Sequence, residues 1–179
     1  MKAFKTLLPV ALLLIIVGCS QKKIPAPEMD LHTAVVMNNI DVIKEHIQAG
    51  SDLNAKEPSR QSTPLLTAAV LGRTDAALAL IDGGADLDYQ NSEGSTALIT
   101  AAFFCRKNIV RALLDKGADP SIRNKAGRTA LDSVKKPFDE VKPIYDALGA
   151  ALAPLGLTLD YATIEATRPV IAQMLEQAS

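Results

Sequence analysis

Few side chains in this 179-residue chain have the types and spacing that catalysis or metal binding requires. There are two histidines, His32 and His46, and two cysteines, Cys19 and Cys105, and they are scattered along the sequence. Isolated histidines and thiols do not supply the ligand set of a typical metal site. The chain also lacks the CxxC, HExxH, GxSxG and GxxxxGK patterns of redox, hydrolytic and phosphate-binding sites. We therefore predict no catalytic residue, no metal site and no cofactor.

Cys19 is the one residue whose surroundings predict covalent chemistry. A short, positively charged start precedes an apolar stretch that is too short for a comfortable membrane span. This stretch closes with Ile16-Val17-Gly18-Cys19, which resembles the lipobox of bacterial lipoprotein signals. The resemblance implies that residues 1–18 are a signal peptide, that they are removed, and that Cys19 then carries diacylglycerol and an acylated amino group. The alternatives are an ordinary secretory signal and an uncleaved anchor.

Acylation of Cys19 would hold the chain at a bacterial membrane. Two or three acyl chains anchor a protein stably, whereas a single chain binds only marginally. Ser20 follows the cysteine where an aspartate would favour the inner membrane, so the resemblance implies the outer membrane and a domain that faces the periplasm. Residues 19–28 form the tether, whose two prolines favour an extended path of at most about 30 Å.

Most of the remaining chain is organised by a 33-residue repeat, which occurs at residues 63–95 and again at residues 96–128. A fixed period of this length is typical of stacked-repeat proteins. The pattern T-P-L-x-x-A-A, followed by L-L-x-x-G-A-D and a turn, closely resembles the ankyrin repeat. We therefore predict an all-α ankyrin-repeat solenoid with three repeats, a degenerate fourth repeat and a C-terminal helical cap.

Each repeat is predicted to form two short helices followed by a projecting loop. In the first clear copy, Thr63 is suited to cap the first helix and Pro64 to begin it. Gly72 should end that helix, and Gly84 should end the second helix at a position that needs a positive φ. The polar residues 86–95 should then form a hairpin-like finger. One such unit cannot bury its apolar face alone, so the repeats must stack.

The repeats are expected to span residues 29–149, from a divergent first copy to a fourth copy that departs from the pattern at Pro137. Because 48% of the chain is hydrophobic but only 4% aromatic, the core should be aliphatic and rich in alanine. Residues 150–179 are predicted to cap the exposed end of the stack with a helix over 160–178 that breaks at 167–169. The alternative for this segment is an amphipathic membrane helix, which its single basic residue disfavours.

The resemblance also implies a binding surface for another protein. Ankyrin domains grip their partners through the finger tips and through the two residues that follow the paired alanines of each first helix. These pairs are apolar and recur at the repeat period, so they would line one concave stripe: Val36, Met37, Val70, Leu71, Phe103 and Phe104. The finger tips are Lys56, Gln90 and Arg123. The alternative is that some of the apolar pairs pack in the core.

Charge divides the chain into two regions of opposite sign, although its total charge is only −1. Residues 28–105 contain 4 basic and 11 acidic side chains, whereas residues 106–142 contain 10 basic and 5 acidic ones. These charges either belong to repeat faces that are simply exposed to solvent, or they steer a partner of complementary polarity. The negative total charge, the few aromatic residues and the extracytoplasmic location speak against nucleic acid as a ligand.

These features predict a non-catalytic protein-binding module that is tethered to the membrane in the periplasm. One role is that of an immunity protein, which would inhibit a secreted toxin such as a lipase-type effector beside the membrane. The alternatives are a scaffold or protective partner of a periplasmic enzyme or envelope protein, and a thiol-dependent redox role for Cys105. Cys105 takes the helix-end position of Gly72, where a side chain costs about 1 kcal/mol, and an unpaired thiol there is either reactive or structural.

Overall fold

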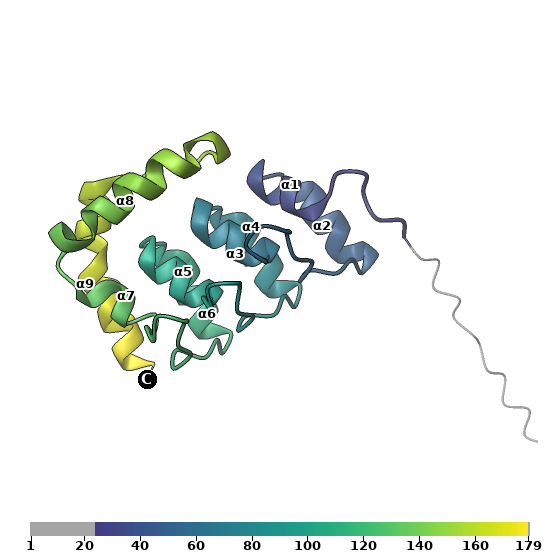
Figure 1. Cartoon of the computed structure of the whole chain (residues 1–179). Helices are drawn as coiled ribbons and strands as arrows, with labels where there is room; N and C mark the ends of the chain where they lie inside the picture. The colour runs from purple at the N-terminus through teal and green to yellow at the C-terminus, as the bar shows by residue number, and fades with distance from the viewer. Residues whose placement is uncertain (1–23, 179) are drawn as a thin grey trace, which may run out of the picture.

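The computed structural model describes residues 24–178, and the regular elements in this part of the chain are all helices (Figure 1). The predicted all-α solenoid is confirmed. The predicted signal peptide, the predicted acylation site Cys19 and the first part of the predicted tether lie outside the described residues. The elements are α1 (Leu31–Val36), α2 (Ile40–Ala49), α3 (Pro64–Leu71), α4 (Thr74–Asp82), α5 (Ala97–Phe103), α6 (Lys107–Asp115), α7 (Asp132–Lys135), α8 (Phe138–Leu152), the 3-10 helix η1 (Ala153–Leu155) and α9 (Tyr161–Gln177).

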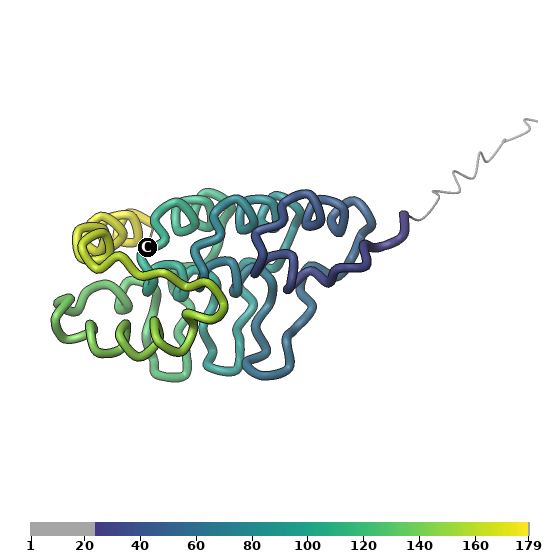
Figure 2. Tube along the Cα trace, turned by 90° about the horizontal axis from the view of Figure 1, so that it is seen from above, coloured from purple at the N-terminus to yellow at the C-terminus, as the bar shows by residue number. Residues whose placement is uncertain are grey.

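The helices form two rows that are joined repeat by repeat (Figures 1 and 2). The inner helices α1, α3, α5 and α7 pack in sequence against one another, and so do the outer helices α2, α4 and α6. Each of α1, α3 and α5 also packs against the outer helix that follows it. α9 continues the outer row, because it packs against both α6 and α7. It therefore takes the place of the outer helix of a fourth repeat.

The ends of the inner helices are fixed by the residues that repeat. The hydroxyls of Thr63 and Thr96 accept backbone N–H groups from the first turns of α3 and α5 at 3.4 and 3.2 Å, as expected of N-caps. α3 ends at Gly72 with a φ of +68°. Asn38 and Cys105, at the equivalent positions, have φ values of +54° and +55°. The left-handed turn after each inner helix is therefore kept even where the residue is not glycine.

The core lies between the two rows and consists mainly of small and aliphatic side chains. The paired alanines of α3 and α5 have no exposed surface, and their small size lets neighbouring helices approach closely: Ala68, Ala69, Ala101 and Ala102. Larger aliphatic side chains from both rows fill the remaining space, and the most deeply buried include Leu65, Leu80, Leu98, Ile109 and Leu113. The alanine-rich, aliphatic core that the composition predicted is thus present.

The loops between successive helix pairs project to one side as fingers (Figure 2). Backbone hydrogen bonds join neighbouring fingers, since Ser92 N–H donates to the carbonyl oxygen of Arg60 at 2.9 Å and Lys125 N–H donates to that of Glu93 at 3.0 Å. The Asp86 carboxylate accepts a backbone N–H two residues ahead at 3.0 Å. This aspartate therefore acts as a turn residue, as the repeated triplet Gly-Ala-Asp predicted.

The segment after the third finger departs from the sequence prediction in two respects. The expected boundary between residues 149 and 150 lies inside α8, which continues to Leu152. The expected break at residues 167–169 is absent, because α9 continues through Pro169. Buried side chains on both sides of this proline share one helix face and hold the helix in one piece: Ile164, Arg168, Ile171 and Leu175.

α8 lies between α7 and α9 in the sequence but belongs to neither row of helices. It leaves the fourth inner position and crosses the open side of the inner helices, so that its end approaches α1 (Figures 1 and 2). The fold is thus a helical solenoid with one inserted helix across its inner face.

No helix in residues 24–178 combines the length and the apolar character that crossing a membrane requires.

Candidate functional site

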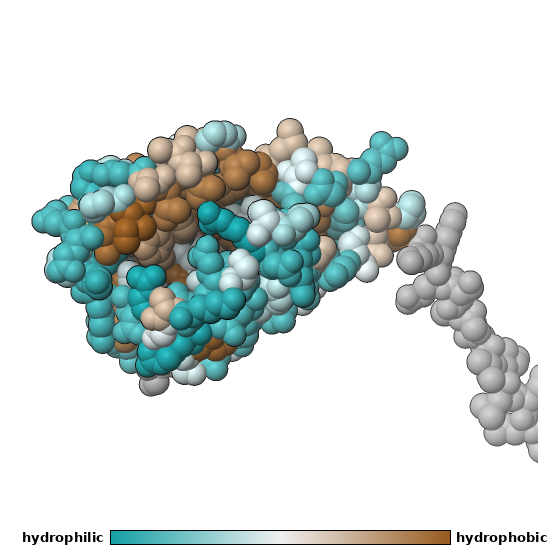
Figure 3. All heavy atoms as spheres, viewed as in Figure 1, coloured by the Kyte–Doolittle hydropathy of each residue, from teal (hydrophilic) through white to brown (hydrophobic). Residues whose placement is uncertain are grey.

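The path of α8 leaves a groove on the inner side of the solenoid, which we call the inner groove. Its floor is formed by the inner helices α3 and α5, one wall by the fingers, and the opposite wall by α8 and η1. The inner groove has a volume of about 570 Å³, which is within the range of pockets that hold small ligands. Figure 3 shows it as a hollow bordered by a strip of apolar side chains.

The wall formed by α8 and η1 is apolar. Ile144, Leu148, Leu152 and Leu155 recur at intervals of about one helical turn, so they share one face that looks into the inner groove. Ile144 remains 44% exposed and Leu155 remains 46% exposed. Complete burial of one such side chain contributes about 1.5–3 kcal/mol. This wall is therefore a contact surface that the chain itself leaves partly uncovered.

The floor of the inner groove is also largely apolar. Leu66 and Val70 contribute to it from α3, and Ile99 and Phe103 contribute from α5. The ring of Phe103 stacks on the ring of Tyr145, with centroids 4.8 Å apart. The apolar floor and α8 are thus in contact at this aromatic pair.

Tyr145 anchors the middle of α8 to the rest of the fold, and Gly156 forms the turn that follows η1. The Tyr145 hydroxyl donates to the carbonyl oxygen of Phe103 and accepts a hydrogen bond from the Arg168 guanidinium at 3.0 Å. Burial raises the pKa of this hydroxyl, so it stays protonated. After η1, the chain turns at Gly156 with a φ of +82°, and a Cβ atom there would lie 2.8 Å from Nη2 of Arg73. The left-handed φ therefore favours glycine at this turn, whereas the end of the Arg73 side chain could move aside.

The structure separates the six residues of the predicted apolar stripe. Three of them are partly buried and line the inner groove: Val36, Val70 and Phe103. Leu71 and Phe104 reach its edge, but they are only 6% and 5% exposed and belong to the core. Met37 is 66% exposed and lies outside the inner groove. Neighbouring residues on a helix point about 100° apart, so the two members of a pair cannot face the groove equally.

The three predicted finger tips do not line the inner groove. The Gln90 amide donates to the carbonyl oxygens of Gly94 at 2.6 Å and of Arg123 at 3.0 Å. The Arg123 guanidinium donates to a carbonyl oxygen of its own finger at 2.7 Å. The Lys56 ammonium lies 5.0 Å from the ring centroid of Tyr89. Gln90 and Arg123 therefore hold the fingers together, and a contact between these tips and a partner stays a prediction.

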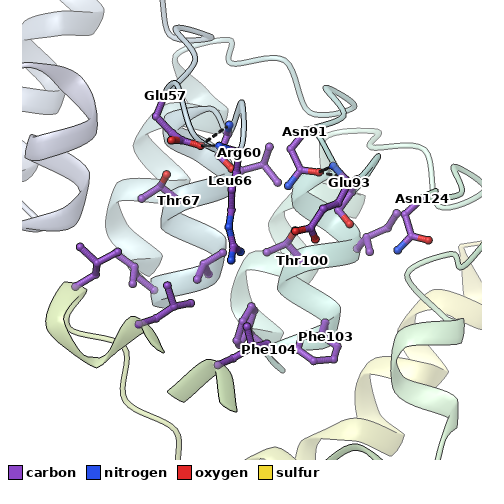
Figure 4. Close-up of a pocket in the computed structure, with 18 of the residues that line it drawn as sticks. Glu57, Arg60, Leu66, Thr67, Asn91, Glu93, Thr100, Phe103, Phe104 and Asn124 are labelled. Carbon is purple, nitrogen blue, oxygen red and sulfur yellow. Dashed lines mark hydrogen bonds between the residues drawn. The ribbon is translucent and has the colours of Figure 1, made fainter. Parts of the chain in front are cut away.

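Two charged finger residues that the sequence prediction missed, Arg60 and Glu93, point into the inner groove (Figure 4). They occupy equivalent positions one 33-residue period apart. Within the described residues, neither side chain forms an ion pair. The repeat register was the signal that could have found them, because positions that face the groove recur at the period of the repeat.

Glu57 fixes the finger backbone that carries Arg60. Its carboxylate accepts the backbone N–H groups of Ser59 at 2.8 Å, Arg60 at 2.6 Å and Ser62 at 3.1 Å. Burial alone would raise the pKa of the Glu57 carboxyl, but the hydrogen bonds from these residues outweigh it and lower the pKa to about 2. Glu57 is therefore ionised at neutral pH and fixes the backbone from which the Arg60 side chain projects.

Two threonines add hydroxyl groups to the floor of the inner groove. Thr67 on α3 and Thr100 on α5 lie one period apart and both line the groove (Figure 4). Neither hydroxyl has a hydrogen-bond partner within residues 24–178. A threonine hydroxyl can both donate and accept a hydrogen bond. The floor thus offers polar groups to a ligand along an otherwise apolar surface.

The histidines and Cys105 have structural surroundings. His32 Nε2 lies 2.8 Å from the carbonyl oxygen of Ala55, and the two ring nitrogens of His46 lie 2.9 and 2.8 Å from a serine hydroxyl and a backbone carbonyl. Cys105 is buried, and this burial raises the pKa of its thiol. In the described part of the chain, no three His, Cys, Asp or Glu side chains gather in a way that could hold a metal ion.

Comparison with known proteins identifies the repeated part of the chain. A family model described as ankyrin repeats, in three copies, matches residues 31–124. The matched region includes α1 to α6 but not α7, α8 or α9. A search of curated proteins returned no match. The floor of the inner groove and its first two fingers therefore lie within the matched repeats, whereas the α8 wall lies beyond them.

Proposed function

Because this chain belongs to the ankyrin-repeat family, whose repeats bind other proteins, we propose that it is a non-catalytic inhibitor held at a bacterial membrane. In this role it acts as an immunity protein, which binds a secreted toxin on the periplasmic side of the membrane and blocks it. A lipase-type effector is one such toxin, because its substrate lies beside the anchored inhibitor. The proposal thus combines a binding surface with a fixed location.

The inner groove is the observation that carries this proposal. Its α8 wall and the floor residues Val70 and Phe103 are incompletely covered by the chain, and charged side chains such as Arg60 and Glu93 lie at its finger side. An exposed apolar surface with a polar rim is typical of protein interfaces. Occupation of this groove by part of a toxin would bury apolar surface on both molecules and hold the toxin inactive.

The lipobox-like sequence before Cys19 supports the membrane location, although it lies outside the described residues. A tether of ten residues, 19–28, would keep the repeats within a few tens of ångströms of the lipid. Confinement of an inhibitor to the surface that a toxin attacks raises its effective concentration there. The anchor therefore favours inhibition at the membrane over action in free solution.

Burial of Cys105 weighs against the thiol-dependent alternative. A reactive cysteine needs an accessible thiolate, whereas this thiol is buried and its pKa is raised by that burial. The positive φ of Cys105 also gives it a structural place at the end of α5. We therefore propose inhibition by binding, and the scaffold role remains as the other outcome of the test below.

The test is purification of the tagged, lipidated protein from its own envelope, followed by mass spectrometry and an activity assay of what it captures. Wild-type protein should retain a toxin-like enzyme and inhibit it. The Ile144→Glu variant should lose that enzyme, because a carboxylate on the α8 wall opposes apolar contact. The matched control is Leu78→Glu, which changes a leucine of similar exposure on the outer helix α4.

Three results would contradict parts of the proposal. A captured enzyme that stays fully active in the complex would indicate a scaffold. Equal capture by wild type and Ile144→Glu would exclude the inner groove as the binding surface. A Cys19→Ala variant that still incorporates labelled palmitate and fractionates with membranes would remove the lipid anchor at this residue.

A further inference from the structure

We infer that the inner groove admits one extended segment of the partner polypeptide, whose apolar side chains face α8 and whose polar side chains face the fingers. This inference rests on the proposed binding function and specifies what enters the groove. Three features define the occupant: the wall added by α8, the free hydroxyls on the floor, and the unpaired charges on the finger wall.

The α8 wall limits the occupant to a single segment. A stable contact between two folded proteins buries about 800 Å² on each partner. The open face of the repeats would suit such a surface, but α8 crosses that face and leaves a slot of about 570 Å³ between itself and the fingers. A folded surface cannot enter this slot, whereas a loop or a chain end can.

The hydroxyls of Thr67 and Thr100 favour a peptide in extended conformation. The backbone of an extended peptide carries N–H and C=O groups that need hydrogen-bond partners when they leave water. A helix satisfies these groups internally, and an acyl chain has none. Two unpartnered hydroxyls, one on each inner helix of the floor, can donate to and accept from such a backbone.

The two walls predict an alternating sequence in the bound segment. Successive side chains of an extended chain point to opposite sides. A segment that lies along the floor would therefore direct every second side chain to the apolar wall at Ile144 and Leu148, and the others to the fingers.

Charge complementarity adds two further requirements to the bound segment. Arg60 and Glu93 project from adjacent fingers without an ion-pair partner in the described part of the chain. Arg60 would bind a carboxylate of the segment, and Glu93 would bind a basic side chain one repeat further along the groove. The partner segment is thus apolar on one side and carries both signs of charge on the other.

A displayed library of random linear peptides tests the inference directly. The library is selected on immobilised wild-type protein after depletion on the Ile144→Glu variant. Selected peptides should alternate apolar and polar residues and contain an acidic residue. Arg60→Glu should weaken their binding by about tenfold or more, and replacing the acidic residue of the peptide with lysine should restore binding to Arg60→Glu. Arg111→Glu, an exposed position on α6 outside the inner groove, is the matched control.

The hydroxyl contribution has its own variant. Thr100→Val keeps the side-chain volume and should weaken peptide binding by about threefold to tenfold at an unchanged melting temperature. Peptides without alternation, peptides that ignore Ile144→Glu, or a library that returns no binder would overturn the inference. Displacement of the selected peptides by palmitate would overturn it too, because the groove would then hold an acyl chain.

Crosslinking in the envelope complex separates this inference from the proposed function. A photoreactive amino acid replaces Leu148 on the α8 wall in the protein used for purification. Crosslinks that fall within one contiguous segment of the captured partner support the inference. Crosslinks to several distant segments of the partner overturn the inference, while the proposed inhibitor function stands. If no partner is captured at all, both are overturned.

Discussion

The Arg168 guanidinium donates a hydrogen bond to the Tyr145 hydroxyl across 3.0 Å and thereby joins α9 to the helix that walls the inner groove. Arg168 is only 3% exposed, and it also donates to the carbonyl oxygens of Lys136 at 2.7 Å and of Ser133 at 3.4 Å. The Tyr145 hydroxyl in turn donates to the carbonyl oxygen of Phe103. A chain of hydrogen bonds therefore runs from α9, through α8, to the floor of the inner groove.

Loss of the Arg168 hydrogen bonds should destabilise the whole C-terminal region. Arg168→Met keeps an extended side chain but leaves buried carbonyl oxygens and the Tyr145 hydroxyl without their donor. We expect the free energy of unfolding to fall by about 2–4 kcal/mol. Urea unfolding followed by circular dichroism measures this change. Arg111→Met, on the exposed face of α6, should change it by less than about 0.5 kcal/mol, and an equal effect of the two variants would contradict the prediction.

The thiol of Cys105 should be unreactive in the folded protein. Burial raises the pKa of this thiol, so the thiolate fraction at neutral pH is smaller than that of an exposed cysteine. With Cys19 replaced by serine, Cys105 is the sole thiol in the chain. We expect labelling by a thiol reagent to be at least about tenfold slower in native buffer than in urea. Equal rates in the two solvents would restore the redox hypothesis.

Acid should weaken the first finger through Glu57. The pKa of its carboxyl is about 2 in the folded protein, below the value of about 4.3 expected in the unfolded chain. The ionised carboxylate therefore stabilises the folded state above about pH 4.3, and this contribution is lost as the pH falls towards 2. The difference in urea midpoint between wild type and Glu57→Gln should shrink over that range. Glu45→Gln, at an exposed position on α2, should show no such trend.

The repeat itself was predictable because its determinants are local. Thr63 and Gly72 cap and end a helix through bonds and φ values that involve only nearby residues. The positive φ at Cys105 followed from its alignment with Gly72, and the structure places it at +55°. The backbone conformation at one position of a repeat can therefore be predicted for the equivalent position of the next repeat, even where the residue type differs.

The inner groove was not predictable, because it depends on residues that are distant in the sequence. The position of α8 is set by Tyr145, whose partners are Phe103 and Arg168. Pro169 predicted a helix break beside Arg168. The helix continues instead, and the Arg168 guanidinium is buried within the fold, which the sequence alone does not show. The backbone that carries Arg60 is fixed by hydrogen bonds within one finger loop, which propensity alone does not reveal.

The two phenylalanines of α5 should differ in what their loss removes. Phe104 is 5% exposed and packs edge-on against Phe103, with ring centroids 5.1 Å apart. Phe104→Ala should therefore lower the free energy of unfolding by about 3–5 kcal/mol, as expected for a core aromatic residue. Phe103 is partly buried by its stack on Tyr145 and presents the rest of its ring to the inner groove.

Phe103→Ala should therefore cost less stability than Phe104→Ala but more binding per folded molecule. Truncation of an aromatic anchor in an interface typically costs at least about 2 kcal/mol, or roughly thirtyfold in affinity. Thermal unfolding of both variants, beside titration with the captured partner under conditions where each is folded, measures the two effects separately. If Phe103→Ala melts earlier than Phe104→Ala, its ring serves mainly to hold α8. If Phe103→Ala binds as tightly as wild type, the Phe103 ring is not part of the interface.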